Sequence, residues 1–163
     1  QSVSQTVSQS VSQSVTQPVS QSVSQPVGQG KKHVLYVPNA GHGLEDISRV
    51  LGGIVNFSRL SAQGKTFPKL DWTHSADDDN LKLSVTSSEA AEKAALWIAT
   101  SDDRDFRDAK WKSIKATQSG DAWSAETDSP KSGYKAVFGE LTYPGDGLKY
   151  QLSTSIKVYK ADK

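Results

Sequence analysis

His42 is the side chain in this sequence best suited to acid–base chemistry, because it lies in a glycine-rich turn, 39–43, between an apolar stretch and a predicted helix. A histidine that acts as a general base needs a nucleophile within hydrogen-bond reach and an acid that orients its ring. No Gly-x-Ser-x-Gly motif occurs in the 163 residues, and no serine stands in an activating context. We therefore expect a non-catalytic chain in which His42 is a turn residue.

Two acidic clusters offer oxygen atoms that a metal ion could use. The first, which ends at Asn80, lacks the spacing of an EF-hand loop, and the second, at 102–108, carries its own counter-ions, Arg104 and Arg107. Calcium needs many oxygen ligands and no competing cations. We expect a solvated turn and a salt-bridged loop, and no cofactor. The weak metal candidates are Asp77, Asp78 and Asp79.

The first 30 residues contain no charged and no aromatic side chain, and residues 1–28 repeat a four-residue unit seven times. Each unit reads Gln, then Ser, Thr or Pro, then Val, then Ser, Thr or Gly. Ser, Thr and Val are weak helix formers, and Pro18 and Pro26 would interrupt a helix. An extended chain would place the hydroxyl groups on one face and would alternate Gln with Val on the other.

Two interpretations of this tail stay open: a disordered linker or stalk, and an assembly strand that pairs with a neighbouring subunit. The assembly contacts would then be the valines, which are Val3, Val7, Val11, Val15, Val19, Val23 and Val27. Ser and Thr interspersed with Pro are also typical of O-glycosylated stalks. The candidate acceptors are Ser2, Ser4, Thr6, Ser8, Ser10, Ser12, Ser14, Thr16, Ser20, Ser22 and Ser24.

All 19 Lys and Arg and all 18 Asp and Glu lie in residues 31–163. The formal net charge of +1 argues against a nucleic acid or an anionic membrane as a partner. No apolar run reaches about 18 residues, so no membrane-spanning helix is predicted. Cysteine is absent, and the chain starts at Gln1 rather than Met, which we interpret as a processed end or a fragment. The absence of cysteine does not indicate a compartment, but the tail and the processed end favour a secreted or cell-surface protein.

The sequence after the tail predicts a strand, the turn and one helix. The apolar strand, 33–38, stops at Pro38, and the helix spans 44–59. Acidic residues in its first turn and Arg59 in its last agree with the helix macrodipole. Its apolar positions follow helical spacing; they are Leu44, Ile47, Leu51, Ile54 and Val55. Asn56-Phe57-Ser58 matches an N-glycosylation sequon.

From Phe67 onward, short strand-like runs alternate with turn signals. The candidates are 69–75, 81–86, 93–99, 110–116, 121–126, 134–143 and 148–160. About seven short strands in this length predict a mainly β, Ig-like or fibronectin-like sandwich. In the last strand, Leu148, Tyr150, Leu152, Thr154, Ile156 and Val158 should face the core. Trp97 is the predicted central buried tryptophan, and Trp72, Trp111 and Trp123 should line the same core or its rim.

Several motifs occur in the order found in one known family. They are HVLYVPNAGHGL at 33–44, Asp71-Trp72, Leu96-Trp97-Ile98-Ala99, Arg104-Asp105-Phe106-Arg107 and Gly133-Tyr134-Lys135-Ala136. Through these motifs, residues 33–160 resemble the C-terminal part of the PhoPQ-activated pathogenicity-related family, which is similar to α/β-hydrolases with a β-domain after the core. The resemblance implies that His42 matches the hydrolase histidine. It also implies that the strands with the nucleophile lie upstream, where the repeat tail stands here.

The predicted organisation is a repeat tail at 1–30, a strand-turn-helix unit at 31–66 and a β-sandwich at 67–163. Three functions stay open. The first is a non-catalytic extracellular assembly protein that self-associates, as a homo-oligomer or filament, through its tail. The second is a secreted glycan- or protein-binding module on a stalk. The third is the C-terminal fragment of a hydrolase, inactive without its upstream core. In each case an exposed apolar stripe on the helix would be an association site.

Overall fold

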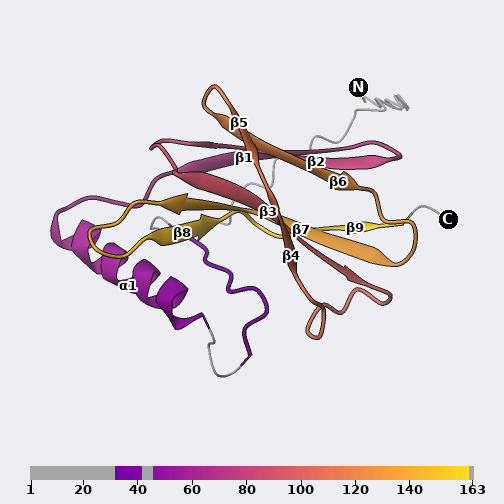
Figure 1. The fold of residues 1–163 in the computed structure, drawn as a ribbon, viewed down its shortest axis with the longest axis horizontal. Helices are drawn as coiled ribbons and strands as arrows, with labels where there is room; N and C mark the ends of the chain where they lie inside the picture. Colours follow the sequence, from indigo (N-terminus) through magenta and orange to yellow (C-terminus); the bar gives the residue numbers. More distant parts are fainter. Residues whose placement is uncertain (1–31, 42–45, 162–163) are drawn as a thin grey trace, which may run out of the picture. The chain divides into compact units, whose positions relative to one another are not determined.

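Two antiparallel β-sheets and one helix make up the part of the chain that the computed structural model describes, residues 32–41 and 46–161 (Figure 1). The repeat tail, with its assembly and O-glycosylation candidates, and His42 lie outside these residues. The four-stranded sheet has the order β1 (Leu70–Ala76), β2 (Asn80–Ser87), β6 (Ala122–Asp128), β5 (Thr117–Ser119). The five-stranded sheet has the order β4 (Lys112–Lys115), β3 (Lys93–Ser101), β7 (Tyr134–Tyr143), β8 (Tyr150–Ser153), and β9 (Lys157–Lys160) also pairs with β7.

This strand order confirms the predicted sandwich. Labelled in chain order, the strands form the ABED and CFG sheets of an immunoglobulin constant-type domain, with β4 added beside β3. The predicted strand 148–160 is divided into β8 and β9. The predicted strand 110–116 contains β4 only, and β5 lies at 117–119, outside every predicted strand. Between β4 and β5 the chain changes sheets at the buried Ala116, whose N–H donates to the carbonyl of Ala94.

The core lies between the two sheets and follows the alternation of the sequence. In β2, Leu81, Leu83 and Val85 are all buried, while the residues between them face outward. In β7, by contrast, every residue from Lys135 to Tyr143 is buried. A strand is buried on both faces only if a second layer covers its outer side. Here that layer is the helix α1 (Ile47–Ala62) together with residues 32–41, which we call the strap.

The predicted core pattern of the last strand is wrong beyond Thr154. Glu140 pairs with Ser153 but Val137 pairs with Lys157, so residues 154–156 oppose only two residues of β7. This extra residue is a β-bulge, and it reverses the faces of everything that follows it. Tyr159 consequently packs on the core instead of Val158, and Ile156 is 36% exposed. Leu148, before β8, is exposed as well. The buried Thr154 hydroxyl accepts the N–H of Gly139 at 2.9 Å and holds the bulge in place.

The predicted strand at 33–38 is reduced to a single bridge, between Val34 and Ser153. The N–H of Ser153 donates to the carbonyl of Val34 at 2.9 Å, but the next strap N–H, that of Tyr36, donates to the Ser153 hydroxyl at 3.2 Å. Because a side chain takes this donor, the ladder does not continue. The predicted helix begins three residues later than expected, with Asp46 as its N-cap rather than in its first turn, and Arg59 lies in its last turn as predicted.

Candidate functional site

The strap crosses the outer face of the five-stranded sheet from the β8 edge to the β4 edge. At one end Val34 bridges to β8. In the middle, the Tyr36 ring lies 4.9 Å from that of Phe138 on β7. At the other end, the Asn39 amide pairs with the backbone of Trp111, donating to its carbonyl at 2.9 Å and accepting its N–H at 2.8 Å. Asn39 has a φ of 58°, a left-handed conformation that asparagine tolerates better than most residues. The strap is therefore fixed at both ends.

Helix α1 packs on β8 and on the loop before it through small and polar side chains. A Cβ added to Gly52 would lie 2.1 Å from the carbonyl oxygen of Lys149, so only glycine permits this approach. One turn later, the Asn56 amide donates to the carbonyls of Gly52 at 2.9 Å and Leu148 at 2.8 Å. Arg59 then donates to the carbonyl of Asp146 at 3.0 Å and also pairs with its carboxylate. The helix thus presents its least apolar face to the sandwich.

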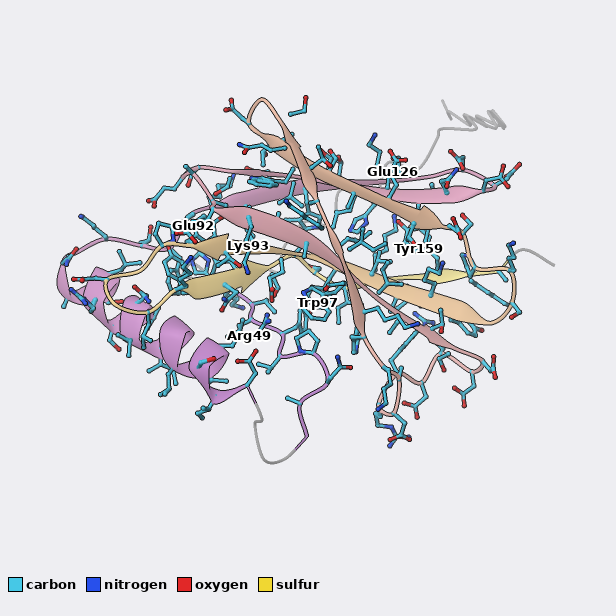
Figure 2. The ribbon with its side chains drawn as sticks, viewed as in Figure 1. Arg49, Glu92, Lys93, Trp97, Glu126 and Tyr159 are labelled. Carbon is cyan, nitrogen blue, oxygen red and sulfur yellow. The ribbon has the colours of Figure 1, made fainter. Side chains whose placement is uncertain are left out.

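The start of α1 is held by a buried ion pair. The Arg49 guanidinium contacts the Glu140 carboxylate on β7, and its Nε lies 3.0 Å from the N-cap carboxylate of Asp46. Figure 2 shows Arg49 close to Trp97, and its guanidinium carbon lies 5.7 Å from the indole centroid. Burial raises the pKa of Glu140, whereas the charge of Arg49 and the Trp97 indole act in the opposite direction. The indole N–H faces this carboxylate without a hydrogen bond of normal geometry.

The face of α1 opposite these contacts is apolar and open. We call its four large side chains the outward stripe: Ile47, Leu51, Ile54 and Phe57. They are between 45% and 57% exposed and follow each other at helical spacing over the first three turns of the helix. Phe57 also touches Phe67, whose ring stacks on Tyr150 of β8 at 4.9 Å. The periodicity correctly predicted the stripe, but the stripe does not face the sandwich.

The four tryptophans do not share one core. Trp123 is buried between the sheets and Trp72 packs against that core, as predicted. Trp97 and Trp111 lie instead on the outer face around Phe138, so the prediction of Trp97 as the central core tryptophan is wrong. Strand parity explains this: Ala94 and Leu96 point into the core, so the odd-numbered Trp97 must point away from it. None of the four, all in the described residues, is an exposed platform for a sugar, and a glycan ligand stays a prediction.

The acidic clusters act as turn and loop elements. The Asp77 carboxylate accepts the N–H groups of Asp79 at 3.0 Å and Asn80 at 2.6 Å, which closes the β1–β2 turn. In the second cluster, Asp105 pairs with Arg107, and this contact lowers the pKa of Asp105 to about 2. Within the described residues, no three metal-ligating side chains come together. The described part also holds no helix of the length and apolarity needed to cross a bilayer.

One open polar cleft lies at the end of the sandwich, between the loops after β3 and β6. Its volume is about 570 Å³. Hydroxyl groups, two carboxylates and two ammonium groups line it, including the buried Lys135, whose ammonium donates to the carbonyl of Asp128. Burial lowers the pKa of Lys135. Sequence reasoning did not identify this cleft, because it joins residues of three strands that no motif connects.

The sequon at Asn56 is structural in this fold. Asn56 is 5% exposed, and the nitrogen that would carry a glycan already donates its two hydrogen bonds. Sequence reasoning also missed the roles of Arg49 and Glu140. The only signal in the sequence was Glu140 itself, the one charged residue in the run 136–143 of β7.

Comparison with known proteins places these features in context. Residues 27–107 match the family model described as PhoPQ-activated pathogenicity-related protein. The match includes the strap, α1 and the first three strands, and it ends before β4. No curated protein matches the chain. A solved structure described as the Br derivative of BhCBM56 is similar at 14% identity and a TM-score of 0.41, over 58% of this chain and 95% of that one. The likeness to BhCBM56 carries no functional argument. Over residues 27–107, the chain is thus similar to the PhoPQ-activated pathogenicity-related family, as its motifs predict.

Proposed function

We propose that this chain is a non-catalytic association module that binds a folded protein through the outward stripe of α1. One observation carries the proposal: the helix is fixed to the sandwich by its small and polar face, so its apolar face is presented outward. A helix whose role were only to cover the sheet would bury its apolar stripe. The exposed stripe is therefore better explained by a partner than by the stability of this unit alone.

The size of the stripe agrees with this role. Each of its four side chains exposes on the order of 100 Å², so the stripe presents about 400 Å² of apolar surface. Patches of roughly 300–600 Å² are the largest that monomeric proteins usually expose, and they are often functional. Covering this area would gain about 10 kcal/mol at 25 cal/mol per Å², comparable with the cost of association. The stripe can anchor an interface that flanking contacts complete.

The tail and the location belong to the same proposal. We infer that residues 1–30 act as a stalk or assembly strand between neighbouring subunits, and that the protein works outside the cell or at its surface. An uncharged segment rich in Ser and Thr and interspersed with two prolines supports this, because such composition is typical of extracellular stalks. We propose a non-catalytic role because the sequence contains no nucleophile motif that His42 could activate.

The test compares the sedimentation of the full chain with that of two variants. Leu51→Glu places a charge in the centre of the stripe and should shift the protein to monomer. Ile114→Lys changes an isoleucine of similar exposure on β4 and serves as the matched control, which should associate like the parent. Association that persists in Leu51→Glu would show that another surface is responsible, and a parent protein that is monomeric would contradict self-association altogether.

A second candidate function follows from the family match. The matched residues include the strap and α1, the two elements that flank His42. By resemblance, His42 would be the histidine of a hydrolase whose core lies upstream, and the outward stripe would pack on that core. If so, fusion to an upstream core of this family should give esterase turnover that His42→Ala abolishes. Turnover that is absent, or unchanged by His42→Ala, rules this candidate out.

A further inference from the structure

The polar cleft at the end of the sandwich is built around a lysine in a core position. In β7, Val137, Leu141 and Tyr143 point between the sheets and belong to the core. Side chains alternate along a strand, so Lys135 points to the same side as Val137. Lys135 is 9% exposed, and its ammonium reaches the other sheet, where it donates to the Asp128 carbonyl at the end of β6. At this end, the core therefore stops at a cation.

The Lys135 ammonium is not neutralised by the residues that the structure describes. It has three N–H donors, and the Asp128 carbonyl accepts from one of them. No ion pair of the described residues includes Lys135. Buried charges in proteins are normally paired, because an unpaired charge is costly to remove from water. Since this ammonium lines an open cleft, an oxyanion of a ligand can supply the missing partner.

The walls of the cleft require more than a bare anion. Four hydroxyl side chains line it, and these are Thr100, Ser101, Ser129 and Ser132. Two carboxylates, those of Asp102 and Asp128, line it as well. Carboxylates repel an anion and accept hydrogen bonds without donating any, so they match a ligand that carries donor groups. Within the described residues, no aromatic ring lines the cleft, so stacking does not hold the ligand.

The two walls are held in position by contacts of their own. Gly133 has a φ of 60°, and a Cβ there would lie 2.4 Å from the Ser101 carbonyl oxygen, so the loop after β6 touches the loop after β3. The same loop is tied to the β1–β2 turn. The Ser129 N–H donates to the Asp79 carbonyl at 2.7 Å, and its hydroxyl donates to the Asp77 carbonyl at 3.0 Å. A preformed site loses little conformational entropy on binding.

We propose that this cleft binds a small hydroxylated carboxylate, with the ligand carboxylate on Lys135 and the ligand hydroxyl groups on Asp102 and Asp128. A free sugar acid and a uronate unit of a polysaccharide share this chemistry. The cleft volume of about 570 Å³ lies in the range of small-molecule sites. The cleft shares no residue with the outward stripe, so this ligand-binding function goes beyond the association function and is tested separately.

Amide chemical shifts of the isotope-labelled full chain, titrated with four probes, test the ligand class. Galacturonate carries a carboxylate and hydroxyl groups, galactose lacks the carboxylate, and acetate lacks the hydroxyl groups. Galacturonate should shift the signals of residues 100–102 and 128–135 and bind several-fold more tightly than galactose or acetate. Equal binding of either control, shifts elsewhere, or no binding overturns the proposal. Trigalacturonate that binds several-fold more tightly than galacturonate assigns the ligand to a polysaccharide, and equal affinity assigns it to a free sugar acid.

Three variants test the site itself. Lys135→Met removes the ammonium but keeps an unbranched apolar side chain, and it should weaken galacturonate binding about ten-fold or more. Lys115→Met, at an exposed position of β4, is the matched control and should bind like the parent. Ser132→Trp fills the exposed rim of the cleft and should also weaken binding, even if Lys135→Met does not fold. Parent-like binding by Ser132→Trp or by folded Lys135→Met would place the ligand elsewhere and overturn the proposal.

Discussion

The Arg49 guanidinium on α1 contacts the Glu140 carboxylate on β7, and the two residues are 91 positions apart in the sequence. This buried pair, with the Gly52 and Asn56 contacts one and two turns later, fixes the rotation of the helix about its own axis. The rotation determines which face is outward, and therefore whether this protein has an apolar association surface. The candidate site is thus a consequence of contacts made on the opposite side of the same helix.

Removing Arg49 alone should strongly lower the stability of the fold. Arg49→Leu leaves Glu140 buried without its partner, and we expect a loss of about 3–5 kcal/mol in the free energy of unfolding at neutral pH. The double variant Arg49→Leu with Glu140→Leu should recover most of this loss, because apolar side chains can replace a buried ion pair at little cost. Urea denaturation measures both. Burial raises the pKa of Glu140. The stability of the Arg49→Leu variant should therefore rise on acidification, when this carboxyl becomes neutral.

The two adjacent glycines of α1 form a matched pair. Gly52→Ala would place a Cβ 2.1 Å from the Lys149 carbonyl oxygen, and we expect it to lower stability by at least about 2 kcal/mol as the helix moves off β8. At Gly53 the nearest atom is the flexible Leu35 side chain at 3.4 Å, so Gly53→Ala should raise stability by up to about 1 kcal/mol through helix propensity. Thermal unfolding compares them, and equal effects would refute the close approach at Gly52.

His74 on β1 makes the fold sensitive to acid. Burial, with Lys157 nearby, lowers the pKa of His74 from 6.5 to about 4. Between these pH values the unfolded chain binds a proton at His74 that the folded chain does not bind. The contribution of His74 to the free energy of unfolding is therefore complete above pH 6.5 and is lost as the pH falls toward 4. Because the ring is only half-buried, we expect on the order of 1 kcal/mol. His74→Phe should reduce the dependence of stability on pH in this range. If the slope is unchanged, the acid sensitivity comes from carboxylates and not from His74.

Asn56 should carry no glycan in any folded fraction, although its sequon is intact. Expression through a eukaryotic secretory pathway, followed by intact-mass measurement, tests this directly. Asn56→Leu should lower stability by about 1–3 kcal/mol, because the Leu148 carbonyl would lose its donor. Ser58→Ala destroys the sequon without touching the hydrogen bonds and should have little effect on stability. A folded protein glycosylated at Asn56 would contradict the packing of α1.

Much of the sandwich could be predicted from local pattern. Alternation in β2, the Asp77 turn and the helical spacing of Ile47, Leu51 and Ile54 each depend on neighbours within a few residues. The errors share a different cause. The bulge at Thr154 inserts one residue into a regular alternation, and the strap forms one bridge because the Ser153 hydroxyl takes the next donor. Neither the bulge nor this hydrogen bond can be predicted from the spacing of the apolar residues.

The sequence by itself determined that the chain has an apolar helical stripe, a two-sheet core and no nucleophile motif, because these properties are read from residue type and spacing. Only the tertiary structure decided that the stripe faces away from the sandwich. The physical reason is steric and electrostatic: Gly52 admits a backbone carbonyl, Asn56 satisfies another, and Glu140 requires a buried counter-ion from Arg49. These contacts join residues that are far apart in the chain, so helical periodicity shows that α1 has two faces but cannot assign either one to the core.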